Sequence, residues 1–129
     1  MQRLLLTLAG ALMITGLPMA AHHSVAAEFD TNKPVTITGS VTKIEWMNPH
    51  AWIYLDVKNA QGQVEKWQFE FGAPNELRRR GWSRTDLKEG QEVTIQGSLA
   101  RKGGNTANAR SIVLPGGKRV FNGQAQPGE

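Results

Sequence analysis

Three histidines are the clearest candidates for chemistry in this chain of 129 residues. His22 and His23 are adjacent and directly follow an apolar leader, and His50 follows the turn signal Asn48-Pro49. Imidazole nitrogens suit copper(II), nickel(II) and zinc(II), and the thioether of Met47 suits copper(I). These residue types predict a transition-metal site at His22 and His50, with His23 and Met47 as further donors and copper as the expected metal.

Residues 1–21 have the pattern of a secretory signal peptide. Arg3 is the only charge, and a 13-residue apolar run from Leu4 to Gly16 precedes small residues. The run is short for a bilayer span and no second apolar stretch follows it. We therefore expect a periplasmic or secreted protein without a transmembrane segment after processing.

The position of the cut decides what the histidine pair can do. A cut after Ala21 would give His22 a free α-amine, which can chelate a metal together with the Nδ1 atom of the same residue. A cut after Ala20 would place His23 third from a free amine, which is the amino-terminal copper and nickel geometry. A cut after Ala27 fits the small-x-small rule but would remove both histidines. The position of the apolar run favours a cut after Ala20 or Ala21.

A second group of candidates is aromatic. Trp46, Trp52 and Tyr54 lie near the first expected hairpin, and Trp52 and Tyr54 alternate with the apolar residues of their strand. Outward-facing aromatic rings can stack on sugars or bases. The alternative is that another segment covers them as a second small core.

A third group is basic. Arg78, Arg79 and Arg80 are consecutive in a short predicted helix, where they could bind phosphate, an acidic glycan or another anion. Helical geometry spreads three consecutive residues around the axis, so a solvated charged surface is the simpler interpretation. Cleavage after Ala21 leaves 14 basic and 11 acidic residues, a net charge of +3, which does not call for a nucleic-acid partner.

The elements that must position these residues are mostly strands. Alternating apolar residues predict strands over 35–46, 51–57, 64–71, 92–99 and 109–114, with 120–121 as a candidate sixth. The apolar positions change parity near Thr42 and Lys43, which predicts a bulge there. Trp67, Phe69 and Phe71 are expected to point inward and Glu70 outward.

The helix signals lie between the third and fourth strands. Pro74 suits a first helical position and Gly81 suits the residue after the end of the helix. This order predicts a mainly-β fold, a small five-stranded OB-like barrel with one short helix between strands 3 and 4. An extended arm over 22–34 would precede the barrel over 35–121, and residues 122–129 would form a disordered tail.

Four segments together resemble a known family. They are HHSVAAEFD, VTKIEWMNPHAWIYLDV, FEFGAPNELRRRGW and NTANARSIVLP. The chain resembles a family of small exported bacterial proteins that is classified as a domain of unknown function. The resemblance implies one exported domain and no particular activity.

Signals of catalysis are weak. The chain has no cysteine, and its carboxylates are scattered along strands rather than paired. We therefore expect a non-enzymatic binding module for a metal ion. Its metal site requires a mature N-terminus that still carries His22 and His23. The alternatives are an OB-type binder of an oligosaccharide or anion, using the aromatic residues and the arginines, and a small copper-dependent oxidoreductase.

Overall fold

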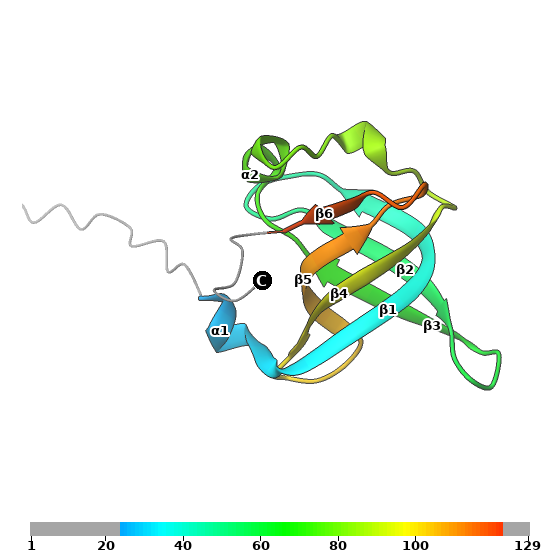
Figure 1. Ribbon diagram of the computed structural model, residues 1–129. Helices are drawn as coiled ribbons and strands as arrows, with labels where there is room; N and C mark the ends of the chain where they lie inside the picture. Colours follow the sequence, from blue (N-terminus) through cyan, green and yellow to red (C-terminus); the bar gives the residue numbers. More distant parts are fainter. Residues whose placement is uncertain (1–23, 123–129) are drawn as a thin grey trace, which may run out of the picture.

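The computed structural model describes residues 24–122, which form one antiparallel-rich sheet with a few short helices (Figure 1). The strands are β1 (Phe29–Glu45), β2 (Trp52–Lys58), β3 (Val64–Glu70), β4 (Glu92–Ala100), β5 (Thr106–Val113) and β6 (Arg119–Phe121). The helices are α1 (Val25–Glu28), α2 (Pro74–Arg79) and the 3₁₀ helix η1 (Arg84–Asp86). The mainly-β prediction is confirmed, and the strands number six rather than five because β6 pairs with β5.

The strand pairings close on themselves. The order is β3-β2-β1-β4-β5-β6, with every neighbour antiparallel, and β3 also pairs in parallel with β5. That parallel pairing joins Gln68 to Thr106, Phe69 to Ala107 and Glu70 to Asn108. Strands β1 to β5 thus form a closed ring of pairings, and β6 lies at its margin (Figure 1).

The long first strand serves two neighbours. Its first part pairs with β4, and its second part, from Ser40 onward, pairs with β2. The register with β2 shifts between Val41 and Lys43, which confirms the bulge predicted from the change of parity. The bulge lets one strand bend from one side of the ring to the other.

Alternating side chains fill the centre of the ring. Ile53, Leu55, Phe69 and Ile95 are almost fully buried, as their period-two pattern predicts. Glu70 is a correction, because it was expected to point to solvent and is only 6% exposed. The outward face of β3 at this point is flanked by the N-terminal segment and by the end of β4. A side chain that points away from the core is therefore shielded from solvent there.

The short helices follow their sequence signals. Pro74 begins α2, Leu77 is buried beneath it, and Gly81 follows its end with a φ of +88° that favours glycine. Ser83 and Asp86 form a capping box at η1. None of the helices found between residues 24 and 122 is long and apolar enough to span a bilayer.

The segment before the ring differs from the extended arm predicted over 22–34. Ser24 caps the helical turn α1 by accepting a hydrogen bond from the backbone N–H of Ala27, and β1 already begins at Phe29. At the other end, the Asn122 side chain accepts from Gly72 N and donates to Ala109 O, both at 2.6 Å. The predicted signal peptide, and positions 123–129 of the predicted tail, lie outside the described residues.

Candidate functional site

The site is built on a contact between a histidine and a buried carboxylate. The Nδ1 atom of His50 lies 3.0 Å from the Oε1 atom of Glu70. The His50 side chain is 46% exposed, whereas that of Glu70 is only 7% exposed. One edge of the imidazole therefore faces the protein while the rest of the ring remains accessible.

Backbone hydrogen bonds hold both residues in place. Glu70 pairs with Trp52 of β2 on one side and with Asn108 of β5 on the other. Next to His50, the backbone N–H of Ala51 donates to the carbonyl of Gly72 and the carbonyl of Ala51 accepts from the N–H of Phe71. The contact between His50 and Glu70 thus lies between two strongly tethered segments.

The electrostatics of Glu70 reflect its surroundings. Burial raises the pKa of the Glu70 carboxyl above its usual value, and the nearby carboxylate of Glu28 raises it further. The imidazole of His50 acts in the opposite direction and lowers this pKa. Glu28 belongs to α1, so the N-terminal segment contributes to the field at the site.

A pocket of about 420 Å³ lies beside this contact. Ala27 and Glu28 of α1 form part of its wall, together with Trp52 and Glu70 on the outward face of β2 and β3. The remaining wall comes from Phe29, Gln68, Ala100, Arg101, Lys102 and Thr106. The pocket therefore combines an aromatic ring, two carboxylates and two cations, and it adjoins the start of the described chain.

The predicted metal donors are only partly described. His50 is the one histidine of residues 24–122, and within that range no three histidine, aspartate or glutamate side chains are placed to hold a metal ion. Met47 lies in the same loop as His50 and is 57% exposed. His22 and His23 precede the described residues, so the structure does not test the predicted set.

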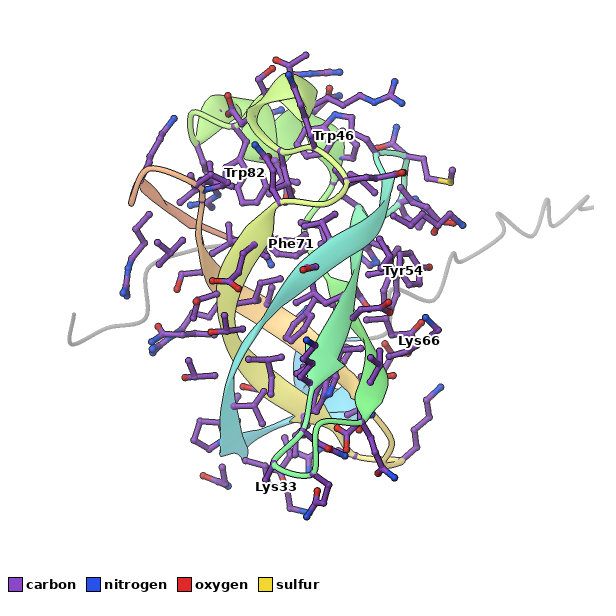
Figure 2. All side chains as sticks on the ribbon, turned by 90° about the vertical axis from the view of Figure 1, so that its right-hand side faces the viewer. Lys33, Trp46, Tyr54, Lys66, Phe71 and Trp82 are labelled. Carbon is purple, nitrogen blue, oxygen red and sulfur yellow. The ribbon has the colours of Figure 1, made fainter. Side chains whose placement is uncertain are left out.

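The three predicted aromatic residues separate into two places. Figure 2 shows Trp46 and Trp82 together at the end of the ring near α2 and η1, with Tyr54 on its flank. The ring centroids of Trp46 and Trp82 are 6.1 Å apart, and Trp82 meets Phe71 edge-on at 5.4 Å. Trp46 is therefore packed against the main core at this end, and of the three predicted aromatic residues Trp52 alone lines the large pocket.

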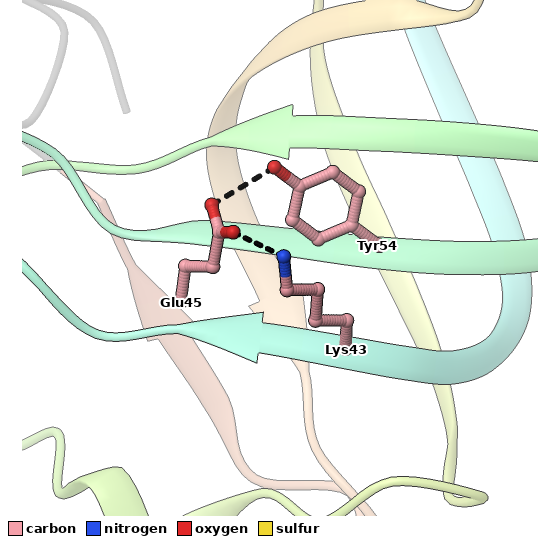
Figure 3. A network of polar contacts seen from close by, with 3 residues as sticks. All are labelled: Lys43, Glu45 and Tyr54. Atoms are coloured by element: carbon pink, nitrogen blue, oxygen red, sulfur yellow. Dashed lines mark hydrogen bonds and ion pairs between the residues drawn. The ribbon is translucent and has the colours of Figure 1, made fainter.

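Tyr54 takes part in a polar network on the flank (Figure 3). Its hydroxyl donates to Glu45 Oε2 at 2.9 Å, and Lys43 donates to the other oxygen of the same carboxylate. Burial raises the pKa of Tyr54, and the hydrogen bond to Glu45 raises it further. The hydrogen bond from Lys43 lowers the pKa of Glu45, and so does that from Tyr54.

The same network limits what the Tyr54 ring can bind. The Nζ atom of Lys43 lies 5.2 Å from the ring centroid, a cation–π distance. A smaller hollow of about 200 Å³ is lined by Tyr54, Lys66, Trp67, Gln68, Asn105 and Thr106. Gln68 and Thr106 line both this hollow and the large pocket, so Tyr54 lies near the large pocket without lining it.

The arginine run does not join the site. Arg78, Arg79 and Arg80 are exposed at α2 and its end, and Arg78 donates to Asn75 Oδ1 at 3.0 Å. None of the three lines the large pocket, whose cations are Arg101 and Lys102. The predicted combination of the arginines with Trp52 and Tyr54 in one ligand surface is not formed by this arrangement.

The sequence reasoning missed two site residues, Glu70 and Glu28. Glu70 was placed on a solvent face because β3 alternates, and nothing in the local sequence indicates that α1 flanks that face. A usable signal is the position of Glu70 between two core residues, Phe69 and Phe71, at the end of β3. Strand ends near a crossing segment are where an outward carboxylate becomes buried.

Comparisons with solved structures give distant likenesses. Rim1, a mitochondrial single-stranded DNA binding protein from S. cerevisiae, is 13% identical with a TM-score of 0.49, over 76% of this chain and 100% of that chain. The N-terminal domain of PriB from Thermoanaerobacter tencongensis is 24% identical with a TM-score of 0.43, over 64% of this chain and 96% of that chain. Likenesses at this level carry no argument about ligands.

The comparison with protein families is more direct. The search of the curated proteins gives no match. Residues 11–109 match a family described as a family of unknown function, DUF6152, which confirms the resemblance inferred from the four sequence segments. Because the match spans most of the chain, this protein belongs to the DUF6152 family.

Proposed function

We propose that this protein is an exported, non-enzymatic binding module that holds a transition metal, copper, through its mature N-terminal histidine and His50. The observation that carries the proposal is the half-exposed imidazole of His50, which lies 3.0 Å from Glu70, a buried residue that lines a pocket together with Ala27 and Glu28 of the N-terminal segment. The proposed site then consists of His50 and the N-terminal histidine of the mature chain.

The topology supports an OB-like barrel as the scaffold. Five strands form a closed ring of pairings, the first of them is bulged, and α2 lies between β3 and β4. This is the element order of the OB-fold, whose ligands lie against the outer face of the second and third strands. His50 immediately precedes this face, and Trp52 and Glu70 are on it.

The N-terminal histidines are close to this face along the chain. Ala27 and Glu28 share a pocket with Glu70, and Ser24 begins the same helical turn. His22 is two residues before Ser24, and two residues of extended chain span at most about 7.2 Å. The described chain thus starts beside the wall to which Glu70 belongs.

The donors in this arrangement suit copper(II). His22 at the N-terminus would supply its α-amine and Nδ1, and His50 a third nitrogen, with His23 as a further nitrogen donor; the thioether of Met47 suits copper(I) instead. The carboxylates of Glu28 and Glu70 favour a bound cation, whereas Arg101 and Lys102 in the wall of the same pocket oppose one. A cut after Ala20 would instead give the amine, two amides and the His23 imidazole, so the N-terminus must be measured.

The test begins with the intact mass of the exported protein, which fixes the cut. Copper(II) is then titrated into this protein and followed by calorimetry and by electron paramagnetic resonance. We expect a 1:1 complex whose spectrum indicates mainly nitrogen ligands. The affinity for copper(II) should fall at least tenfold in His50→Ala. The matched control is Met47→Leu, which removes a thioether from the same loop and should leave copper(II) binding unchanged.

A second variant tests the chain end. One extra residue before His22 keeps every side chain but removes the amine from the position that chelates with Nδ1. We expect this chain to lose the spectrum of the native complex. Equal copper binding by the native chain, the extended chain and His50→Ala would overturn the proposal, and so would a mature N-terminus at Glu28.

A saccharide ligand is the second candidate function. The pocket of about 420 Å³ is in the size range of small-molecule sites, and it contains Trp52 beside Gln68, Thr106 and Arg101. An aromatic ring with amide, hydroxyl and guanidinium groups suits the apolar faces and hydroxyls of a sugar. Neutral and acidic oligosaccharides should then quench tryptophan fluorescence in the native protein but not in Trp52→Ala, and an unchanged signal with both classes argues against this function.

A further inference from the structure

A further hollow, of about 260 Å³, lies over β1, β4 and β5 and shares no lining residue with the large pocket. Its walls contain hydroxyl groups, an amide and a guanidinium group, and no carboxylate is among the described residues that line it. These residues are Thr31, Pro34, Val35, Thr36, Gln96, Gly97, Ser98 and Arg110. The hollow therefore offers hydrogen-bond donors and positive charge.

Two arginines converge on one neutral atom at the edge of this hollow. The Oε1 atom of Gln96 lies 3.5 Å from a guanidinium nitrogen of Arg110 and 3.4 Å from one of Arg119. The two nitrogens are thus no more than about 7 Å apart, and like charges at that separation repel one another. Within residues 24–122 no carboxylate forms an ion pair with Arg119. The acceptor that the two cations share carries no charge to offset theirs.

A bulge in β5 brings Arg110 to this position. The register between β4 and β5 shifts between Gln96 and Gly97, and Arg110 is the extra residue on β5. Consecutive residues of a regular strand point to opposite faces, yet Arg110 and Ser111 both donate to the same oxygen. The bulge thus turns a second side chain of β5 toward Gln96.

Gln96 is fixed from the protein side. Ser111 is 1% exposed, and its hydroxyl donates to Gln96 Oε1 at 3.2 Å. Three donors meet this one atom, so it is the amide oxygen, and the two N–H donors on Nε2 are left for another acceptor. No described residue accepts a hydrogen bond from them.

We propose that this hollow binds a tetrahedral oxyanion, a phosphate or sulfate group, through the guanidinium groups of Arg110 and Arg119. The amide N–H groups of Gln96 and the hydroxyls of Thr36 and Ser98 are the further donors. Guanidinium groups donate in pairs to the oxygens of such anions. Donors from three strands suit an anion with more oxygens than the two of a carboxylate.

The size of the hollow limits the ligand. Pockets for drug-sized molecules begin at about 300 Å³, so about 260 Å³ suits a small anion or one terminal group of a larger molecule. The proposal goes beyond the metal-binding function and uses none of its residues.

The acids closest to the hollow do not compete with such a ligand. Asp30, which precedes Thr31, faces Arg101 at a distance of 3.7 Å. Glu92 is on the same face of β4 as Gln96 but four residues away, which is about 13 Å along a strand. An external anion is therefore the available counter-charge for the two arginines.

The first measurement locates the site without any variant. Inorganic phosphate is titrated into the ¹⁵N-labelled exported protein without added metal, and sodium chloride keeps the ionic strength constant. We expect saturable shifts in the amide signals of residues 96–98 and 110–111. Shifts that do not saturate, or that extend equally to the arginine run at α2, would overturn the proposal.

The second measurement supplies the missing negative charge from the protein. Gln96→Glu places a carboxylate where the two guanidinium groups meet, so phosphate affinity should fall at least about tenfold. The thermal unfolding midpoint should rise, because the new charge offsets the repulsion between the arginines. Gln61→Glu is the matched control, since it makes the same change of charge in the exposed turn after β2. Native phosphate affinity in Gln96→Glu would contradict the proposal.

A pair of arginine variants tests the same site by removing charge. Arg119→Gln should weaken phosphate binding about tenfold, the effect of losing a hydrogen bond to a charged group. Arg84→Gln is its matched control, because Arg84 is exposed in η1 and lines neither pocket. Equal losses in the two variants would mean general attraction to a basic surface and would overturn the proposal.

The source of the anion is identified with two probes. Binding of glycerol 3-phosphate at least as tight as that of inorganic phosphate would show that the hollow takes a phosphate group carried by a larger molecule. Binding of inorganic phosphate alone would identify a free anion as the ligand, and binding of neither would refute the site. His50→Ala should leave phosphate binding unchanged, so this proposal and the metal-binding function stand or fall separately.

Discussion

Gly97 of β4 occupies a position that excludes any side chain. A Cβ atom added there would lie 2.2 Å from the backbone oxygen of Asn108 and 3.2 Å from the Cα atom of Ala109. Both obstacles are backbone atoms of the neighbouring strand, so no rotamer change relieves the clash. Restoring an ordinary contact of 3.4 Å requires the strands to separate by about 1.2 Å. The affected residue, Asn108, also pairs with Glu70, so the strain would reach the site.

Gly97→Ala should therefore destabilise the protein by about 3 kcal/mol, the upper part of the range for overpacking. For a domain of this size the midpoint of thermal unfolding should fall by about 12–24 °C. Circular dichroism during heating measures the shift. Gly72→Ala is the matched control, because every atom within 4 Å of its Cβ belongs to a side chain, the nearest being Asn122 Oδ1 and Glu76 Oε2 at 3.2 Å, and it should cost less than Gly97→Ala. A midpoint for Gly97→Ala within about 3 °C of the native value would refute the reasoning.

Three further outcomes are expected. Tyr54 is the only tyrosine, so absorbance near 295 nm during alkaline titration should give a midpoint above 10, and Glu45→Gln should lower it because the acceptor loses its charge. Because the folded state favours the neutral hydroxyl, this contribution to stability is present below pH 10 and is lost as the pH rises through the folded pKa, which urea unfolding at pH 9 and above can detect. Leu77→Ala, which empties a position that is 1% exposed beneath α2, should cost about 2–5 kcal/mol in urea unfolding. Lys66→Ala breaks an exposed ion pair with Asp56 and should change stability by less than about 1 kcal/mol.

Local signals were sufficient for much of the fold. The bulge after Val41 follows from a change of parity in one strand, and the start of α2 follows from Pro74. The inward set Ile53, Leu55 and Phe69 follows from alternation, since a strand has only two faces. These features depend on neighbours in the sequence, and the sequence therefore predicts them.

Features that depend on distant pairing were not predictable in the same way. The fifth strand was expected from Ala109 and begins at Thr106, because residues 106–108 pair with β3 rather than follow a pattern of their own. The burial of Glu70 depends on α1 and on the end of β4, which lie far from it in the sequence. Of the candidate site, the exposure of His50 could be anticipated from its place after a turn, but its carboxylate partner could not.

The parallel pairing between β3 and β5 has a consequence for how the site comes into being. Gln68 and Thr106, which also share a side-chain hydrogen bond, are 38 residues apart, and contacts of such separation form late because the intervening loop must be ordered first. Glu70 acquires its second neighbouring strand only in this step. A chain in which β2 and β3 have paired but the ring has not closed would already place Glu70 beside Trp52 and next to His50, but would hold Glu70 from one side only. The rigidity of the contact between His50 and Glu70, rather than its existence, would therefore report that the ring has closed.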